Sequence, residues 1–212
     1  MILDDKNSLA DALTDVRKAY RLLWAYQKRV FDVVRLIVSE FDDMGFYYWQ
    51  TMHADRPCNS GTNPLARWTW DMLPMLEASY LFLPSGVDRN STMPGTWMLE
   101  VHVESDSGFE DPHDGTEPNP EQFKDAALSK SKVSIYAWYC TGQTNLNWFT
   151  NVWSSLDWPE NEQGGVVEYV DPPFKIFGRT LDLSALPSKE SVSIAAAMFR
   201  IDASAALEAS LE

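Results

Sequence analysis

Apolar residues recur at alternating steps of three and four along the first 41 residues, and this repeat constrains the fold more than any other feature. Its members are Leu9, Leu13, Val16, Tyr20, Leu23, Gln27, Val30, Val34, Ile37 and Phe41, with Gln27 as the polar exception. This spacing places the side chains on one face of an α-helix. We therefore predict a helix over about residues 8–43, capped by Ser8 or Asn7 and ended by Gly45.

The apolar face of this predicted helix is wider than the seam of a two-stranded coiled coil. Tyr26 extends one side of the face, and Trp24 and Phe31 extend the other. Such a wide face predicts packing against a sheet or several helices, while Gln27 is of the kind that sets the register of a helix pair. These four side chains are the predicted interaction residues, and a homodimer through residues 8–43 is the most specific version.

Beyond residue 45, short runs rich in β-branched and aromatic residues alternate with Pro, Gly, Asn and Asp. The predicted strands are 46–52, 76–83, 96–105, 132–140, 165–170, 174–183 and 191–201, with 67–73 as a further candidate. Two short helices are expected between strands, at 119–129 and 145–156. Strands and helices do not alternate regularly, so we predict an α+β fold in which the long N-terminal amphipathic helix packs on a mainly antiparallel, strongly aromatic sheet.

Charge is distributed unevenly along the chain, whose net charge is −14. Residues 6–40 carry seven Lys and Arg against four Asp and Glu, whereas residues 41–212 carry ten against 25. Opposite charges attract, so the basic helix is expected to dock on an acidic surface of the same or another chain. We therefore predict that residues 1–44 are a dimerisation or docking element. Residues 45–212 are predicted to be an acidic β-rich domain that folds as one unit with it. The acidic surface disfavours direct binding to nucleic-acid phosphates, although an acidic mimic of nucleic acid remains an alternative.

Three features favour a cytoplasmic protein without a membrane anchor. Cys58 and Cys140 stand in no zinc-type spacing, and such sparse cysteine indicates a reducing compartment. The N-terminus is acidic and lacks the basic start and apolar stretch of a signal peptide. No apolar run reaches the ~20 residues that a membrane-spanning helix needs.

The sequence contains none of the spaced motifs of common enzymes: no G-x-G-x-x-G, no G-x-x-x-x-G-K, no G-x-S-x-G and no H-E-x-x-H. Glycine is scarce, at ten residues, so a phosphate-cradling loop is unsupported. An enzyme is therefore less favoured than a binding protein, and no cofactor is expected.

The segment EVHVES is the strongest candidate for chemistry. In a β-strand, Glu100, His102 and Glu104 share one face, and the acidic loop that follows supplies His113 and Asp114. Imidazole and carboxylate groups suit a divalent metal such as zinc or manganese, so a metal-binding protein or metal-dependent enzyme is the alternative function. The interpretation we favour is simpler: an acidic protein shows this strand face to water.

Trp158 stands among acidic residues in the segment DWPENEQG. It either contacts a protein partner, for which tryptophan is a frequent anchor, or folds back over the preceding helix. The sequence as a whole predicts a non-catalytic protein–protein interaction module, of the inhibitor or immunity type or an assembly protein, whose partner is a protein and could be a second copy of the chain.

Overall fold

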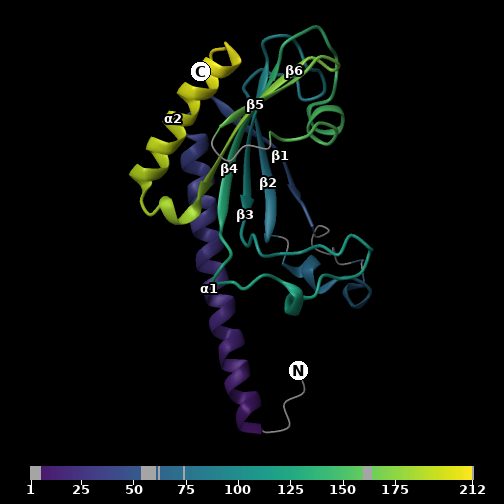
Figure 1. Ribbon diagram of the computed structural model, residues 1–212, viewed down its shortest axis with the longest axis vertical. Coiled ribbons are helices and arrows are strands. Elements are labelled where there is room, and N and C mark those ends of the chain that lie inside the picture. Colours follow the sequence, from purple (N-terminus) through teal and green to yellow (C-terminus); the bar gives the residue numbers. More distant parts are fainter. Residues whose placement is uncertain (1–5, 54–60, 62, 74, 160–163, 212) are drawn as a thin grey trace. The chain divides into compact units, whose positions relative to one another are not determined.

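The computed structural model describes residues 6–53, 61, 63–73, 75–159 and 164–211; Cys58 lies outside them. The chain divides into two compact units, Met1–Arg35 and Leu36–Glu212. The division falls in the last turns of the N-terminal helix, before the expected boundary at residue 44. The second unit holds the sheet and the C-terminal helix (Figure 1).

The N-terminal helix, α1, spans Lys6–Val38 and so confirms the helical repeat. It ends before the expected residue 43, because the chain turns there: the Ser39 hydroxyl donates to the Leu36 carbonyl at 2.8 Å. Asp43 then adopts a left-handed conformation with φ 57°. Gly45 is not the helix end, since it lies within the first strand.

Six strands form one sheet in the order β1-β2-β3-β4-β6-β5, and every neighbouring pair is antiparallel. Their bounds are Met44–Thr51 for β1, Glu77–Pro84 for β2, Trp97–Glu104 for β3, Lys132–Cys140 for β4, Gly165–Tyr169 for β5 and Phe174–Asp182 for β6. Each strand coincides closely with a predicted run. The α+β class and the antiparallel sheet are therefore confirmed.

The predicted strand at 191–201 is wrong, because this segment belongs to the helix α2, Lys189–Leu207. The Ser191 amide donates to the Ser188 hydroxyl at 3.1 Å, and the Ser188 amide donates to the Ser191 hydroxyl at 3.0 Å. This reciprocal cap starts a helix. Residues 195–197 are alanines, the best helix formers, and they outweigh the β-branched residues that suggested a strand.

The other short elements also differ from expectation. Among the described residues, 3-10 turns lie at Pro64–Ala66, Thr69–Met72, Pro120–Gln122 and Leu183–Ala185, and a π-helix spans Trp148–Trp153. The candidate strand 67–73 is thus mainly a 3-10 turn. The helix expected at 119–129 stops after one turn, because the Lys124 amide donates instead to the Gly108 carbonyl at 3.1 Å. The helix expected at 145–156 is a shorter and wider π-helix.

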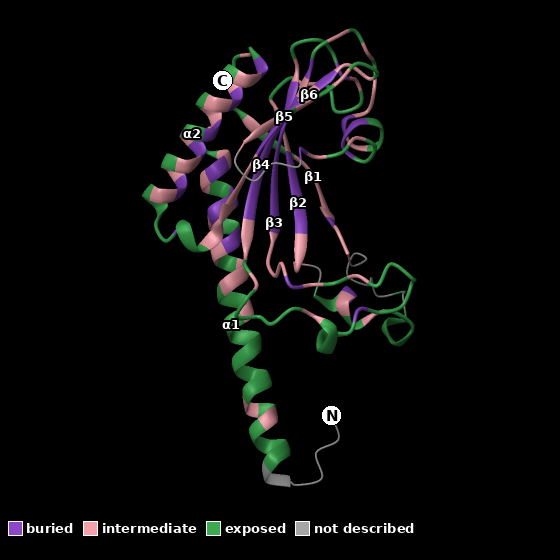
Figure 2. Ribbon diagram, viewed as in Figure 1, coloured by how far each residue is buried: buried purple, intermediate pink, exposed green. Residues whose placement is uncertain are grey.

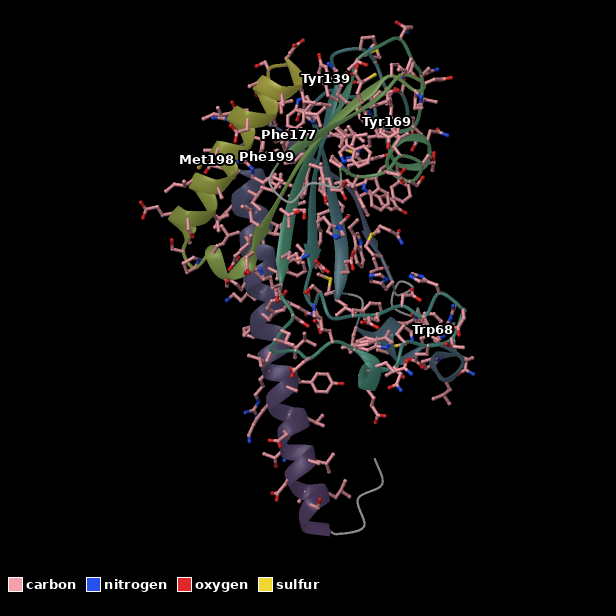
Figure 3. The ribbon with its side chains drawn as sticks, in the orientation of Figure 1. Trp68, Tyr139, Tyr169, Phe177, Met198 and Phe199 are labelled. Carbon is pink, nitrogen blue, oxygen red and sulfur yellow. The ribbon has the colours of Figure 1, made fainter. Side chains whose placement is uncertain are left out.

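Both faces of the central strands are covered, as the burial colours show (Figure 2). On one face, Phe177 of β6 meets Phe199 of α2 with ring centroids 5.4 Å apart (Figure 3). On the other face, the π-helix segment completes a core whose fully buried members include Trp138, Trp148 and Phe174. A strand between two packed layers has no face for water, which matters for the charged residues of β3.

Within the described residues, we find no helix that combines the length and the apolar character needed to cross a membrane.

Candidate functional site

A row of polar side chains crosses the middle of the sheet on the face that the π-helix segment covers. Glu77 and Ser79 alternate along β2, and Glu100 and His102 alternate along β3, so each pair points to the same side. The strand register places Ser79 directly opposite His102. With His53, which follows β1, these five residues form what we call the buried polar network.

Glu100 lies at the inner end of the buried polar network and has no exposed surface. Its Oε1 accepts a hydrogen bond from the Ser79 hydroxyl at 2.6 Å. Its Oε2 accepts from the indole N–H groups of Trp138 at 2.8 Å and of Trp158 at 3.0 Å. Donors converging from three residues supply the hydrogen bonds that a buried carboxylate needs to replace water.

The network continues from Glu100 toward the surface. His102 Nδ1 lies 2.8 Å from the Ser79 hydroxyl, and its Nε2 lies 3.1 Å from Glu77 Oε1. The other Glu77 oxygen lies 2.5 Å from His53 Nε2. The His53 side chain is 28% exposed and borders a cavity of about 350 Å³ together with Arg67, Trp68 and other residues. The chain of contacts thus runs from the core to solvent.

Glu77 and His53 each shift the pKa of the other. Burial disfavours the charge on Glu77, but hydrogen bonds from His102 and His53 outweigh it and lower the pKa of Glu77 to about 2. The hydrogen bond to Glu77 raises the pKa of His53, against the opposing effect of burial. Glu77 is therefore an anion held by imidazole groups on both sides.

Ser79, His102 and Glu77 follow the order of a hydroxyl, imidazole and carboxylate relay. The geometry nevertheless does not suit nucleophilic attack. Ser79 has no exposed surface, and its hydroxyl lies within donating distance of Glu100. The arrangement holds charge inside the sheet, and the Ser79 hydroxyl is not accessible to a substrate from solvent.

The expectation that this face of β3 meets water is wrong, because the π-helix segment and Trp158 cover it. Glu100 is fully buried and His102 is only 8% exposed. Exposure increases toward the end of the strand: the Glu104 side chain is 26% exposed and pairs with Lys132 at 3.4 Å.

The structure does not bring the predicted metal-site residues together. His113 is exposed and lies 3.7 Å from Asp111, measured from Nδ1 to Oδ1. Asp114 is also exposed and accepts hydrogen bonds from Thr116 within its own loop. Among the described residues, no group of three or more His, Cys, Asp and Glu side chains is arranged to hold a metal ion.

Sequence reasoning missed three members of the network: His53, Glu77 and Ser79. His53 lies just after β1 and Glu77 begins β2, so the two meet only through the β1–β2 pairing. The sequence does hold one clue to Ser79, because it is a small polar residue inside the apolar run of β2. A buried serine in such a run must find a hydrogen-bond partner, and this requirement could have pointed to the facing strand.

Trp158 folds back beside Trp153 of the preceding π-helix, as in the second of its two predicted positions, and it also lies over the sheet. Its ring centroid lies 5.2 Å from that of His102, 6.1 Å from Tyr136 and 6.2 Å from Trp153. Tyr136 lies close over β6 because position 178 is a glycine: a Cβ there would come within 2.5 Å of the Tyr136 ring. Glycine at this position therefore makes room for the stacked pair of Tyr136 and Trp158.

A second cavity, of about 820 Å³, opens beside this stack. We call it the aromatic cavity. Its walls come from the end of β1, from β4 and from the segment after the π-helix, and its lining residues are Gln50, Thr51, Met52, Tyr136, Trp153, Ser154, Ser155, Leu156, Asp157, Trp158 and Pro159.

The predicted interaction residues on α1 divide into two groups. Trp24 is 66% exposed and Phe31 is 37% exposed, whereas Tyr26 and Gln27 are half-buried. Trp24 continues a row of apolar side chains that are exposed in the first unit. This exposed stripe consists of Leu9, Leu13, Val16, Tyr20 and Trp24, with exposed fractions of 47, 48, 48, 70 and 66%. Beyond its grey tip, the lower part of α1 is accordingly mostly green in Figure 2.

Comparison with known proteins places the chain in a family. The model of the PM0109 family matches residues 6–208. The chain belongs to the PM0109 family. A relative from Pasteurella multocida (strain Pm70), named "Uncharacterized protein PM0109", is 30% identical over 196 residues, which cover 88% of this chain and 89% of the relative. No solved structure matches. The family match spans both the exposed stripe on α1 and the buried polar network.

Proposed function

We propose that this PM0109-family chain is a non-catalytic protein–protein interaction module that self-associates through the exposed stripe on α1. The observation that carries the proposal is the stripe itself. Leu9, Leu13 and Val16 are each about half exposed, and Tyr20 more so, on the first unit. Their steps of four, three and four match the seam of a coiled coil. Contiguous apolar surface of this kind is characteristic of interaction sites.

Charge and periodicity favour a second copy as the partner. The ion pair that joins Lys18 to Asp15 at 2.9 Å lies on the side of α1 away from the stripe and leaves its apolar row uninterrupted. Small side chains at Ala12 and Ala19 flank the row and permit close approach of a second helix. Gln27 falls in the same repeat, where one polar residue selects a register. We therefore propose a homodimer, in which two copies of the stripe bury one another.

The polar network supports a non-catalytic role. Ser79 is the hydroxyl nearest to an imidazole in the network, and it is buried with Glu100 as its acceptor. We also propose a cytoplasmic location, since cysteine is rare in the sequence and Cys140 is a buried free thiol.

Light scattering after gel filtration at micromolar concentration tests the dimer. We expect a mass of about twice the protomer mass of 24.1 kDa. Leu13→Asp should return the protein to one protomer mass, because a charge would be buried in the apolar seam. Leu22→Asp is the matched control: Leu22 is 73% exposed and lies on the opposite side of the helix, since nine residues of α-helix make about two and a half turns.

A third variant tests whether the dimer forms through α1 or through α2, which also has an exposed apolar face. Ile194, Met198 and Ile201 are exposed along α2, at 54, 53 and 66%, and Met198 is labelled in Figure 3. The proposal requires Met198→Asp to remain dimeric. A wild-type protein of one protomer mass, or loss of the dimer in Met198→Asp and not in Leu13→Asp, would refute self-association through α1.

A further inference from the structure

The side chains that line the aromatic cavity favour one class of ligand over others. Tyr136, Trp153 and Trp158 supply three aromatic rings from β4, the π-helix and the segment after it. The rings are held in fixed positions: Trp153 is only 8% exposed and its ring stacks on Phe149 with centroids 5.3 Å apart. The cavity is therefore preorganised, and a ligand need not order these side chains on entry.

The charges around the aromatic cavity are of one sign. Asp157 is the charged member of its lining, which includes no Lys, Arg or His among the residues that the structure describes there. Behind the wall, Trp158 donates its indole N–H to the buried carboxylate of Glu100. This hydrogen bond places a negative charge next to the indole and increases the electron density of its ring. The whole second unit, residues 36–212, carries ten Lys and Arg against 26 Asp and Glu.

Aromatic faces next to negative charge attract cations. The ring quadrupole of Trp and Tyr binds ammonium and guanidinium groups, and the attraction grows as the site loses water. A neutral planar ligand would gain the stacking contacts without the charge term, and an anion would be repelled. From the residues that line the aromatic cavity, we propose that it binds an organic cation, namely an ammonium or guanidinium group. The rings of Tyr136, Trp153 and Trp158 would contact the cation, and Asp157 would be its counter-charge. This site is independent of the self-association proposed for α1.

The cation can come from a free amine or from a basic side chain of another protein, since both present the same group. Calorimetric titration of the full chain with four probes distinguishes these sources. Choline and butylguanidinium represent free cations, and a short Lys- and Arg-containing peptide represents a protein segment. The uncharged choline analogue 3,3-dimethylbutan-1-ol has the same shape without the charge. We expect at least one cationic probe to bind about tenfold or more tightly than this alcohol.

Two variants and a control locate the binding. Trp158→Leu should weaken the cation about tenfold, as expected for the loss of one partly desolvated cation–π contact. Trp68→Leu is the matched control: Trp68 is also half-buried but lines the 350 Å³ cavity beside His53 (Figure 3). It should leave the affinity unchanged.

Trp158→Leu also removes a hydrogen bond to Glu100 and can unfold the protein, so a surface variant is needed as well. Asp157 is exposed, and its backbone rather than its side chain contacts Tyr169. Asp157→Asn should therefore preserve the fold while weakening the cation a few-fold and reducing the dependence of its affinity on salt. The proposal is overturned if the alcohol binds as tightly as the cations, if neither class binds at millimolar concentration, or if Asp157→Asn leaves both affinity and salt dependence unchanged.

Discussion

The exposed stripe on α1 and the buried polar network on β3 reverse the usual placement of side chains. Leu13 and Val16 belong to an apolar repeat, yet each is 48% exposed. Glu100 and His102 belong to a polar row on an alternating strand, yet Glu100 is fully buried. The difference teaches that a sequence pattern identifies which side chains share a face, whereas burial depends on what covers that face. The polar row is covered by its own chain, whereas the apolar stripe is exposed in the described part of the chain.

The largest expected effect comes from removing the buried charge. Glu100→Ala leaves the indole groups of Trp138 and Trp158 and the Ser79 hydroxyl without their acceptor. We expect the free energy of unfolding to fall by about 3–5 kcal/mol, because each buried donor left without its acceptor costs about 1–3 kcal/mol. Urea denaturation measures this loss. Glu104→Ala, on the same strand face but partly exposed beside Lys132, should cost less than about 1 kcal/mol. Equal losses in the two variants would contradict the burial gradient along β3.

The next largest effect is a loss of stability at low pH, through Glu77. The pKa of Glu77 is lowered from 4.5 to about 2 in the folded protein. Its contribution is therefore complete above pH 4.5 and is lost as the pH falls through about 2, which amounts to about 3 kcal/mol. Glu77→Gln should lose this part of the acid sensitivity, measured as unfolding free energies near pH 5 and pH 2. Glu110→Gln, at an exposed position on the neighbouring loop, should keep it.

The same ion pair also makes stability depend on pH through His53, and here stability falls as the pH rises. The pKa of His53 is raised above 6.5 by its hydrogen bond to Glu77, so its contribution is complete below pH 6.5 and is lost as the pH rises through the folded value. His53→Gln should flatten stability over that range. A stability curve unchanged by this variant would show that His53 does not hold Glu77 in solution.

A smaller effect tests the close packing next to the network. Gly178→Ala would place a Cβ 2.5 Å from the Tyr136 ring, so the ring must move. We expect a loss of about 1–3 kcal/mol in unfolding free energy, typical of overpacking. Gly45→Ala is the matched control, because a Cβ at that strand glycine would meet its nearest atom, the Leu83 carbonyl oxygen, at an ordinary 3.7 Å. If Gly178→Ala is as stable as Gly45→Ala, Tyr136 does not lie over β6 in solution.

The smallest effect is expected on the exposed stripe. Leu13→Ser should change the free energy of unfolding by less than about 0.5 kcal/mol at protein concentrations too low for association, because Leu13 is half exposed. Ile37→Ala, in the same apolar repeat but only 1% exposed, should cost about 2–5 kcal/mol. A similar cost for the two would show that the stripe is buried within a single chain.

The fold was predictable wherever a pattern was local. The 3.6-residue repeat located α1, and the β-branched and aromatic runs located β1 to β6, because these signals depend on neighbours in sequence. The helix α2 was mistaken for a strand at 191–201, since the alternation of Val192 and Ile194 with serine imitates a strand. There, the reciprocal cap of Ser188 and Ser191 was the local signal that should have decided the assignment.

The candidate site was only partly predictable, for a different reason. Alternation correctly placed Glu100 and His102 on one face of a strand. It could not reveal that Glu77 and Ser79 lie opposite them, because strand register is a long-range property. Nor could it show that Trp158, far along the chain, closes over Glu100. Its position depends on the turn after the π-helix, which has no simple sequence signature.

The hydrogen bonds from Trp138 and Trp158 to one Glu100 oxygen also give the molecule a built-in optical reporter. Indole absorption and emission respond to the electric field along the ring, and here two chromophores share one carboxylate charge as their nearest neighbour. Any event that shifts Glu100, from occupation of the aromatic cavity to loosening of the sheet, must change the spectrum of both rings together. The chain holds nine tryptophans, so this report is the part of the emission that depends on Trp138 and Trp158.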